Sequence, residues 1–324
     1  PLAGGAEASV LAFADSRRVV IENVDVTASA GHAVRLDRCG GRITACRVAY
    51  AAETGIRAVD SAGLVIAGNE VSDCGNNGIQ VWRSVAGEDG TQVSGNRIAR
   101  IRSAAGGSGE FGNGINVFRA GGVAVTGNRI TDCAYSAIRA NAASNVSIVS
   151  NSAARIGEVA IYAEFAFEGA VIAQNLVDGA ATGISVTNFN EGGRLAVIQG
   201  NLLRNLHRRE AEPADKRGEG IAVEADATVS GNTIEGAATV GLMIGWGPHM
   251  RDVVATGNLI RGAPVGILVT ADPEAGACFV ASNMISGAKD GAIRAMRHGT
   301  AFGPDLAREE AASRRVVIRD NMAV

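Results

Sequence analysis

The sequence predicts an all-β fold, a single right-handed parallel β-helix of about twelve coils with three short strands per coil and a ladder of stacked asparagines. Two observations carry this prediction. An asparagine recurs ten times after a short β-branched run and usually before another aliphatic residue. A second motif, a small residue followed by an aliphatic one, alternates with it along the chain.

The recurring asparagines stand at Asn69, Asn96, Asn128, Asn151, Asn175, Asn201, Asn232, Asn258, Asn283 and Asn321. Asn23 and Cys46 extend the series backwards in steps of 23 residues. We expect each asparagine to take the left-handed conformation at a tight bend, with a neighbouring glycine supplying the other unusual backbone angle. Its side-chain amide would bond to the asparagine of the next coil. These residues are therefore predicted to be structural.

The second motif marks another strand of each coil, as in Gly55-Ile56, Gly78-Ile79 and Gly114-Ile115. With the run before each asparagine and the aliphatic residue after it, one repeat holds three strands of a few residues each. Such strands are too closely spaced for a βαβ unit or for a four-stranded propeller blade. Stacked coils with three parallel sheets fit this spacing.

The composition favours one elongated domain covering residues 1–324, because no Pro- or Ser-rich linker divides the chain. The formal net charge of −3 argues against a nucleic-acid partner. No apolar run is long enough for a membrane span. The chain begins at Pro1 almost in repeat register, so we expect a leader or capping segment before it.

The five cysteines show no metal-binding spacing, and the histidines form no metal-ligand pattern either. No metal site and no cofactor are therefore expected. Buried cysteines acting as small hydrophobic residues fit best. Whether Cys39 and Cys46 form a disulfide stays open.

The repeat pattern at residues 114–130, with Gly114-Ile115 followed by Gly127-Asn128, resembles that of the pectin-lyase-like superfamily of right-handed parallel β-helices. More narrowly, it is similar to uncharacterised repeat proteins of alphaproteobacteria that are exported by the twin-arginine route. The resemblance covers nearly the whole chain. It implies a periplasmic or secreted protein and chemistry on polysaccharides, most often by a lyase, hydrolase or epimerase. The narrower family implies no established activity.

Three stretches depart from the period and are predicted as loop inserts, at about 97–113, 202–219 and 297–313. The first two precede the same kind of strand, some four coils apart. We expect them to form two rims of a groove over the strands between them. The third is predicted to be a cap or a contact surface.

Alternation along the strands predicts which side chains face this groove. The first outward column runs through Arg57, Gln80, Asn116, Arg139, Tyr162, Ser185, Ala222, Met243, Leu268 and Arg294. The second outward column runs through Trp82, Phe118, Asn141, Glu164, Thr187, Glu224, Gly245 and Thr270. The middle of this surface combines a cation, a phenol and a carboxylate with aromatic and amide side chains.

Such a surface suits an extended polysaccharide or oligosaccharide. The predicted substrate-binding residues are Trp82, Asn116, Phe118, Asn141, Thr187 and Asn188, which offer flat faces and polar groups for sugars. Arg139 could neutralise a uronate carboxylate, while Tyr162 could act as acid or base on the proton of the carbon beside that carboxylate. Glu164 is the third candidate catalytic residue of this region. The structural alternatives are an aromatic stack that shields the sheet and a surface ion pair between Arg139 and Glu164.

Glu164 and Glu224 offer a competing chemistry. They share one column two coils apart, roughly 9.6 Å by strand spacing, near the separation of carboxyl groups in inverting glycosidases. However, the sequence lacks the Asn-Thr-Asp, Asp-Asp and Gly-His-Gly motifs of polygalacturonases and the aspartate cluster of calcium-dependent pectate lyases. The resulting hypothesis is a polysaccharide-active protein that leans towards a lyase or epimerase. A non-catalytic carbohydrate-binding or envelope scaffold protein is the alternative, and the oligomeric state stays open.

Overall fold

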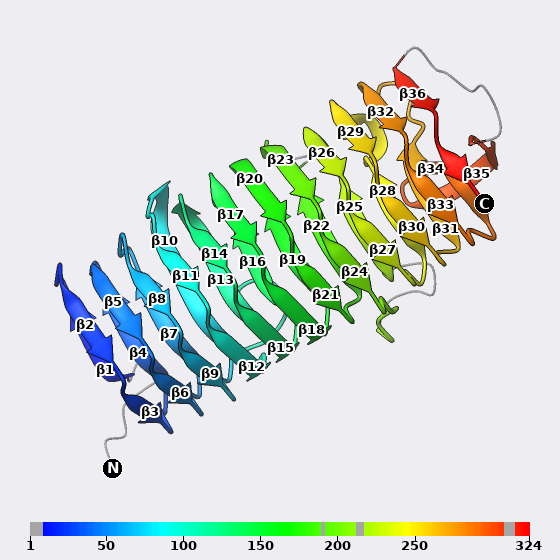
Figure 1. The fold of residues 1–324 in the computed structure, drawn as a ribbon. Coiled ribbons are helices and arrows are strands. Elements are labelled where there is room, and N and C mark those ends of the chain that lie inside the picture. The colour runs from blue at the N-terminus through cyan, green and yellow to red at the C-terminus, as the bar shows by residue number, and fades with distance from the viewer. Residues whose placement is uncertain (1–8, 189–191, 212–216, 308–314) are drawn as a thin grey trace. The chain divides into compact units, whose positions relative to one another are not determined.

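The computed structural model describes residues 9–188, 192–211, 217–307 and 315–324. Contacts divide the chain into two compact units, Pro1–Ala163 and Glu164–Val324. Both units are built from the same coil, in which three short strands belong to three different parallel sheets (Figure 1). The described residues contain no α-helix, and one 3-10 turn, η1, spans Gly247–His249. The prediction of an all-β parallel β-helix is confirmed.

The strands of the first unit follow one another sheet by sheet along the chain. The first sheet holds β1 (Ser9–Ala14), β4 (His32–Asp37), β7 (Thr54–Val59), β10 (Asn77–Glu88), β13 (Asn113–Gly121), β16 (Ile138–Asn141) and β19 (Val159–Glu164), whose last residue begins the second unit. The second sheet holds β2 (Val19–Glu22), β5 (Gly41–Thr44), β8 (Val65–Ala67), β11 (Gln92–Ser94), β14 (Ala124–Thr126) and β17 (Val146–Val149). The third sheet holds β3 (Asp25–Thr27), β6 (Arg47–Ala49), β9 (Glu70–Ser72), β12 (Arg97–Ile101), β15 (Arg129–Cys133) and β18 (Ser152–Ile156).

The second unit repeats this arrangement with its own strands. Its first-sheet strands are β22 (Thr182–Thr187), β25 (Glu219–Val223), β28 (Val240–Ile244), β31 (Val265–Thr270), β34 (Gly291–Arg297) and β35 (Thr300–Asp305). Its second-sheet strands are β20 (Glu168–Ala173), β23 (Arg194–Gln199), β26 (Ala227–Ser230), β29 (Val253–Thr256), β32 (Cys278–Ala281) and β36 (Val316–Arg319). Its third-sheet strands are β21 (Leu176–Asp178), β24 (Leu202–Arg204), β27 (Thr233–Glu235), β30 (Leu259–Arg261), β33 (Met284–Ser286) and β37 (Met322–Ala323).

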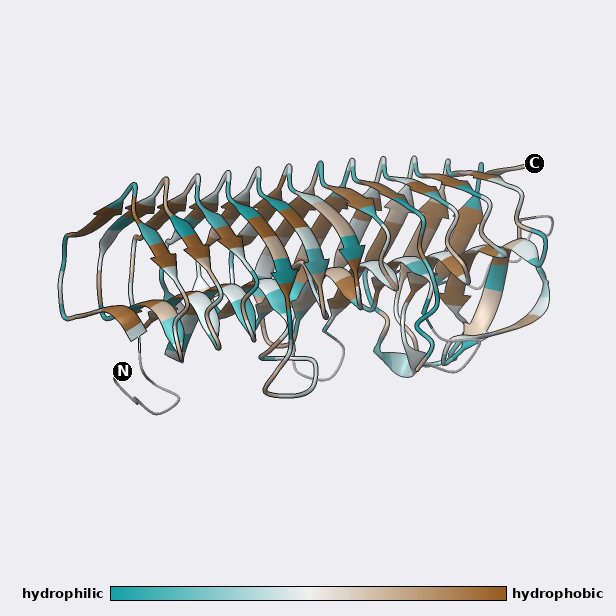
Figure 2. Cartoon of the chain, turned by 90° about the horizontal axis from the view of Figure 1, so that it is seen from below, coloured by the Kyte–Doolittle hydropathy of each residue, from teal (hydrophilic) through white to brown (hydrophobic). Residues whose placement is uncertain are grey.

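The core of each coil is a stack of aliphatic side chains in register. In the first sheet, Ile79 is the register partner of both Ile56 and Ile115, and Ile115 is the partner of Ile138. All four are 0% exposed. Burying an isoleucine of this kind contributes about 1.5–3 kcal/mol. Figure 2 shows the result as hydrophobic bands that run along the strands, with hydrophilic residues at many of the bends.

The predicted asparagine ladder is present in both units. In the first unit, the Nδ2 atoms of Asn69, Asn96 and Asn128 each donate to the Oδ1 of the next asparagine at 2.9 Å, as far as Asn151. In the second unit, the same bonds join successive asparagines from Asn175 to Asn321 at 2.9–3.0 Å. Each ladder asparagine is therefore committed to the scaffold.

The backbone at these bends differs from the prediction in one respect. The left-handed conformation belongs to the residue before the ladder asparagine, such as Gly127 with φ 63°, and not to the asparagine. Asn23 has φ 55° and so occupies this preceding position. The carbonyl of Val24 accepts from the Arg47 amide as that of Cys46 accepts from Glu70, so Val24 holds the ladder position. The assignment of Asn23 to the ladder was wrong by one residue.

The end of the second unit carries a short hairpin. Strand β35 pairs antiparallel with β34, and the carboxylate of Asp305 accepts the backbone amides of Ala292 and Ile293 at 2.8 and 3.0 Å. The described part of the insert at 297–313 thus covers the last parallel strand of its sheet, which otherwise would expose unpaired backbone groups. Residues 308–313 of this insert lie outside the described residues.

All five cysteines are buried and carry free thiols, so Cys39 and Cys46 are not bridged. Burial raises the pKa of Cys74 and of Cys278 to about 12. These thiols act as small core residues, as the sequence predicts.

Candidate functional site

The strand register of the first unit aligns the first outward column. Arg57 is the partner of Arg35 and Gln80, Gln80 is the partner of Asn116, and Asn116 is the partner of Arg139. Most of this column is covered, since Gln80, Asn116 and Arg139 are 1%, 3% and 8% exposed. The side chains point out of the coil, yet little of them reaches solvent.

The first insert explains part of this cover. Residues 102–112 join β12 to β13 and lie on the first sheet, where the Asn116 Nδ2 donates to the carbonyls of Gly109 and Glu110 at 3.3 and 2.9 Å. The Asn77 Nδ2 donates to the Glu110 carbonyl at 2.8 Å, and the Asn113 Nδ2 to the Gly109 carbonyl at 3.0 Å. A sugar hydroxyl could take the place of these carbonyls only if the insert moved.

Arg139 and Tyr162 lie together. The guanidinium carbon of Arg139 sits 4.8 Å from the centroid of the Tyr162 ring, and Tyr162 is half-buried. This geometry is a cation–π contact, which fixes the cation and the phenol beside each other on one face. Asn141, two residues beyond Arg139 on β16, is also half-buried.

The aromatic residues of the second outward column form a stack. Trp82 and Phe118 are register partners with ring centroids 4.3 Å apart and planes inclined by 34°. The guanidinium carbon of Arg119 lies 4.7 Å from the centroid of the Phe118 ring. Phe118 is therefore largely engaged by protein, and Trp82 is the better candidate for contact with a ligand.

Four predicted site residues belong to the second unit. Glu164 is 1% exposed and Thr187 is half-buried. Asn188 is fully buried, and its Nδ2 and Oδ1 bond the backbone of Ala225 at 2.8 and 3.1 Å. Its backbone amide donates to Glu224 Oε2 at 2.6 Å. Asn188 thus holds the bend after β25 and positions the Glu224 carboxylate, so we leave it out of the proposed ligand contacts.

The second insert lies in this unit, and residues 212–216 of it fall outside the described residues. The Gly218 amide donates to the Ala181 carbonyl at 2.6 Å, and Arg208 Nη2 reaches the Ala238 carbonyl at 3.4 Å. The described ends of the insert therefore pack beside the bends that precede β22 and β28.

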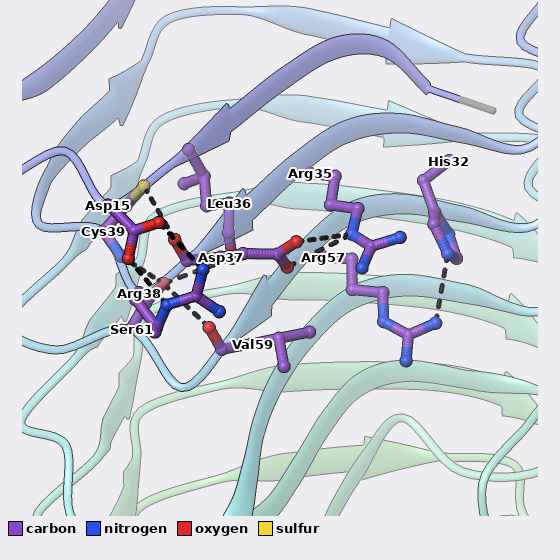
Figure 3. Close-up of polar contacts among 10 residues, drawn as sticks. All are labelled: Asp15, His32, Arg35, Leu36, Asp37, Arg38, Cys39, Arg57, Val59 and Ser61. Carbon is purple, nitrogen blue, oxygen red and sulfur yellow. Dashed lines mark hydrogen bonds and ion pairs between the residues drawn. The ribbon is translucent and has the colours of Figure 1, made fainter. Parts of the chain in front are cut away.

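Sequence reasoning missed a polar cluster at the start of the first outward column (Figure 3). The Nε atom of Arg35 contacts both carboxylate oxygens of Asp37 at 3.0–3.1 Å. Arg57 points instead at His32, with 3.0 Å between Nη1 and Nε2. Burial and the charges of Arg57 and Arg35 lower the pKa of His32 to about 4, although Asp37 opposes this shift. The available signal was the position of Arg35, 22 residues before Arg57 in the same column.

His32 is expected to make folding stability depend on pH. The folded protein holds the pKa of His32 near 4, whereas an unfolded chain would titrate near 6.5. As the pH falls from about 6.5 to 4, His32 becomes protonated in the unfolded state but stays neutral in the folded state. The free energy of unfolding therefore falls by about 3 kcal/mol. Urea unfolding followed across this range measures the slope.

The matched variant is His32→Asn, in which the amide oxygen can still accept the Thr54 backbone amide that now donates to Nδ1 at 3.2 Å. In this variant the free energy of unfolding should no longer change with pH above pH 5. An equal pH dependence in both proteins would show that groups other than His32 cause it.

Two further properties of the described residues bear on function. They contain no group of three or more His, Cys, Asp or Glu side chains that could hold a metal ion. No helix in this part of the chain is long and apolar enough to cross a membrane.

The fold and its ladder identify the class of protein. The sequence matches the model of the right-handed β-helix region over residues 5–98, 32–201 and 85–260, so the chain belongs to the right-handed β-helix family. No curated protein matches the chain in sequence.

Solved structures that are similar to this chain include a lacto-N-biosidase, a tailspike protein and an alginate epimerase. The GH136 lacto-N-biosidase from Eubacterium ramulus covers 93% of the chain with a TM-score of 0.57 at 11% identity. A tailspike protein of E. coli bacteriophage HK620 covers 97% with a TM-score of 0.53 at 10% identity. The periplasmic alginate epimerase AlgG, as a double mutant, covers 93% with a TM-score of 0.51 at 10% identity. The chain spans 61%, 58% and 85% of their respective lengths, and at these identities the similarity shows the fold alone.

Proposed function

We propose that this protein holds an extended acidic glycan along the first sheet of its first unit and acts on it as a lyase or epimerase. The observation that carries the proposal is the Arg139–Tyr162 pair, in which the guanidinium carbon lies 4.8 Å from the ring centroid, with Arg139 aligned beside Asn116 by the strand register. Trp82 lies in the neighbouring column and offers an indole face to a sugar ring. The similar structures support sugar chemistry by their names, which include a lacto-N-biosidase and an alginate epimerase.

In this mechanism Arg139 neutralises the carboxylate of a uronate unit, which makes the proton on the adjacent carbon easier to remove. Tyr162 takes part in that transfer as acid or base. In a lyase, the electron pair left by the proton forms a carbon–carbon double bond, and the glycosidic oxygen leaves with a proton. In an epimerase, a proton returns to the same carbon from the opposite face. Neither reaction requires a cofactor.

The test is a screen of the purified protein against uronate-containing polysaccharides. A rise in ultraviolet absorbance reports the unsaturated product of a lyase, and incorporation of deuterium from solvent at the carbon beside the carboxylate reports an epimerase. Release of reducing ends without absorbance would replace the proposal by a hydrolase, for which Glu164 and Glu224 are the candidates. Binding with none of these products would establish the non-catalytic alternative.

The same proposal places the protein in the periplasm or outside the cell, where such polymers occur. The resemblance to twin-arginine-exported repeat proteins supports this placement, and one similar structure is named a periplasmic enzyme. Fractionation of cells that express the natural full-length protein tests it. Retention of all the protein in the cytoplasm would contradict it.

A further inference from the structure

We propose that His32, Arg57 and Gln80, at the start of the first outward column, form a binding site for the carboxylate of an acidic sugar. This proposal rests on the proposed function in one respect, namely that the carboxylate belongs to a glycan lying along the same column. The site has more hydrogen-bond donors and more positive charge than its surroundings in the first unit can satisfy.

The donor excess begins at His32 (Figure 3). The backbone amide of Thr54 donates to His32 Nδ1 at 3.2 Å, while Arg57 Nη1 lies 3.0 Å from Nε2. A neutral imidazole carries a proton on one nitrogen, and a guanidinium nitrogen can only donate. Whichever ring nitrogen holds the proton, one donor therefore faces another donor. An acceptor placed beside Nε2 and Arg57 would resolve this conflict.

Within the described part of the chain, two more buried donors without acceptors lie on strands β7 and β10. Gln80 is the register partner of Arg57 and is 1% exposed, and its Nε2 has no hydrogen-bond partner among the described residues. The Nε atom of Arg57 is also buried and unpartnered within the same described set. Buried donors left unsatisfied are costly, and their presence calls for a specific reason. A ligand group that carries only acceptors would satisfy these donors and would explain why they are left unpaired.

The surplus of positive charge in this cluster also favours an anionic ligand. Arg35 and Arg57 are register partners, so two like charges face each other across adjacent strands. The nearby carboxylate of Asp37 is occupied by Arg35. Arg57 has no ion pair with any carboxylate that the structure describes. Arg35 and Arg57 are half-buried, so the positive end of the cluster is open to solvent.

A carboxylate matches both the unpaired donors and the positive charge, because it accepts hydrogen bonds through two oxygens and is negative. Its expected contacts are Arg57 and Gln80, with the His32 Nε2–H as a further donor. A sulfate or phosphate group shares this chemistry, so the experiment compares the two sources directly.

The experiment follows the ring signals of His32 by NMR in the intact protein, which has four histidines. D-glucuronate is added, with D-glucose as the neutral probe and sodium sulfate as the inorganic anion. Glucuronate should shift the His32 signals saturably and raise the His32 pKa from about 4, because a bound anion favours the imidazolium over its present surroundings of Arg57, Arg35 and Asp37. Glucose should do neither, and sulfate should bind more weakly than glucuronate.

Two variants make the assignment specific. Arg57→Met removes the charge and should weaken glucuronate binding at least about tenfold. Gln80→Glu places a built-in carboxylate in the site and should abolish binding while leaving the protein folded. Arg129→Met, an exposed arginine on the third sheet, is the matched control and should bind glucuronate as the unaltered protein does.

The proposal is overturned if glucuronate leaves His32 unmoved, if glucose or sulfate acts as strongly, or if Arg57→Met retains full affinity. The same measurements distinguish failure of this site from failure of the proposed function. If the protein processes a polysaccharide but glucuronate does not shift the His32 signals, the proposed function stands and this site is refuted. If glucuronate binds here but the protein neither binds nor processes any polymer, the site stands and the proposed function is refuted.

Discussion

Replacing Asn128 by alanine is expected to lower the free energy of unfolding by about 3–5 kcal/mol. The Asn128 Nδ2 donates to the Val93 carbonyl and to the Asn151 Oδ1, both at 2.9 Å. Its Oδ1 accepts the backbone amide and the side-chain amide of Asn96, also at 2.9 Å. Asn128 is 1% exposed, so water cannot replace these bonds without opening the coil. Alanine would leave several buried polar groups unpaired at once. Urea unfolding at neutral pH measures the loss.

Asn321→Ala is the matched control, because Asn321 belongs to the same ladder but is only half-buried. It accepts from Asn283 at 2.9–3.0 Å, but solvent can reach this edge after the substitution. We expect a loss of about 1 kcal/mol or less there. Equal losses at both positions would mean that burial of the ladder contributes little and that the coil packing alone sets stability.

The repeat pattern of the sequence was sufficient to predict the fold. A ladder asparagine in most coils and an aliphatic residue at each strand centre leave few other arrangements that satisfy their side chains. The conformation at the bend was harder to predict, because glycine and asparagine both tolerate positive φ. The structure assigns the positive φ to the residue before the asparagine, including residues such as Ser150 and Gln174 that favour it little.

The columns of the candidate site followed from the same periodicity, but the exposure of their side chains did not. Asn116 was expected to offer its amide to a ligand, whereas the insert occupies it through Gly109 and Glu110. Asn188 was expected to do the same, whereas the backbone of Ala225 occupies it. A strand period fixes direction alone, and the path of an irregular loop depends on contacts that no period encodes.

The His32 cluster shows a different limit. Its residues come from β4, β7 and β10, and each of them is unremarkable in its own repeat. The surplus of donors becomes visible only when the register brings Arg35, Arg57 and Gln80 side by side. Reading the column from the first coil, and counting donors against acceptors along it, would have found this cluster.

Arg139→Met and Tyr162→Phe are each expected to lower turnover of a uronate polymer by about 10²–10⁴-fold with little change in binding. Phenylalanine keeps the ring over which the Arg139 guanidinium lies, at 4.8 Å, so the packing is preserved while the hydroxyl is lost. Methionine keeps an unbranched apolar side chain and removes the charge. Steady-state rates, together with calorimetric affinities for the intact polymer, separate the two effects.

The controls for this prediction are Tyr50→Phe and Trp82→Ala. Tyr50 is 58% exposed and follows β6 of the third sheet, so its variant should match the unaltered protein in rate and in affinity. Trp82→Ala should weaken polymer binding by up to about tenfold, because a sugar would lose its stacking face, and should spare the rate at saturating polymer. The reverse ranking, in which Trp82→Ala removes binding while Arg139→Met and Tyr162→Phe change nothing, would identify a binding protein. The reason is physical: a groove that only holds a glycan depends on contact area, whereas one that moves a proton depends on a charge and a hydroxyl at fixed positions.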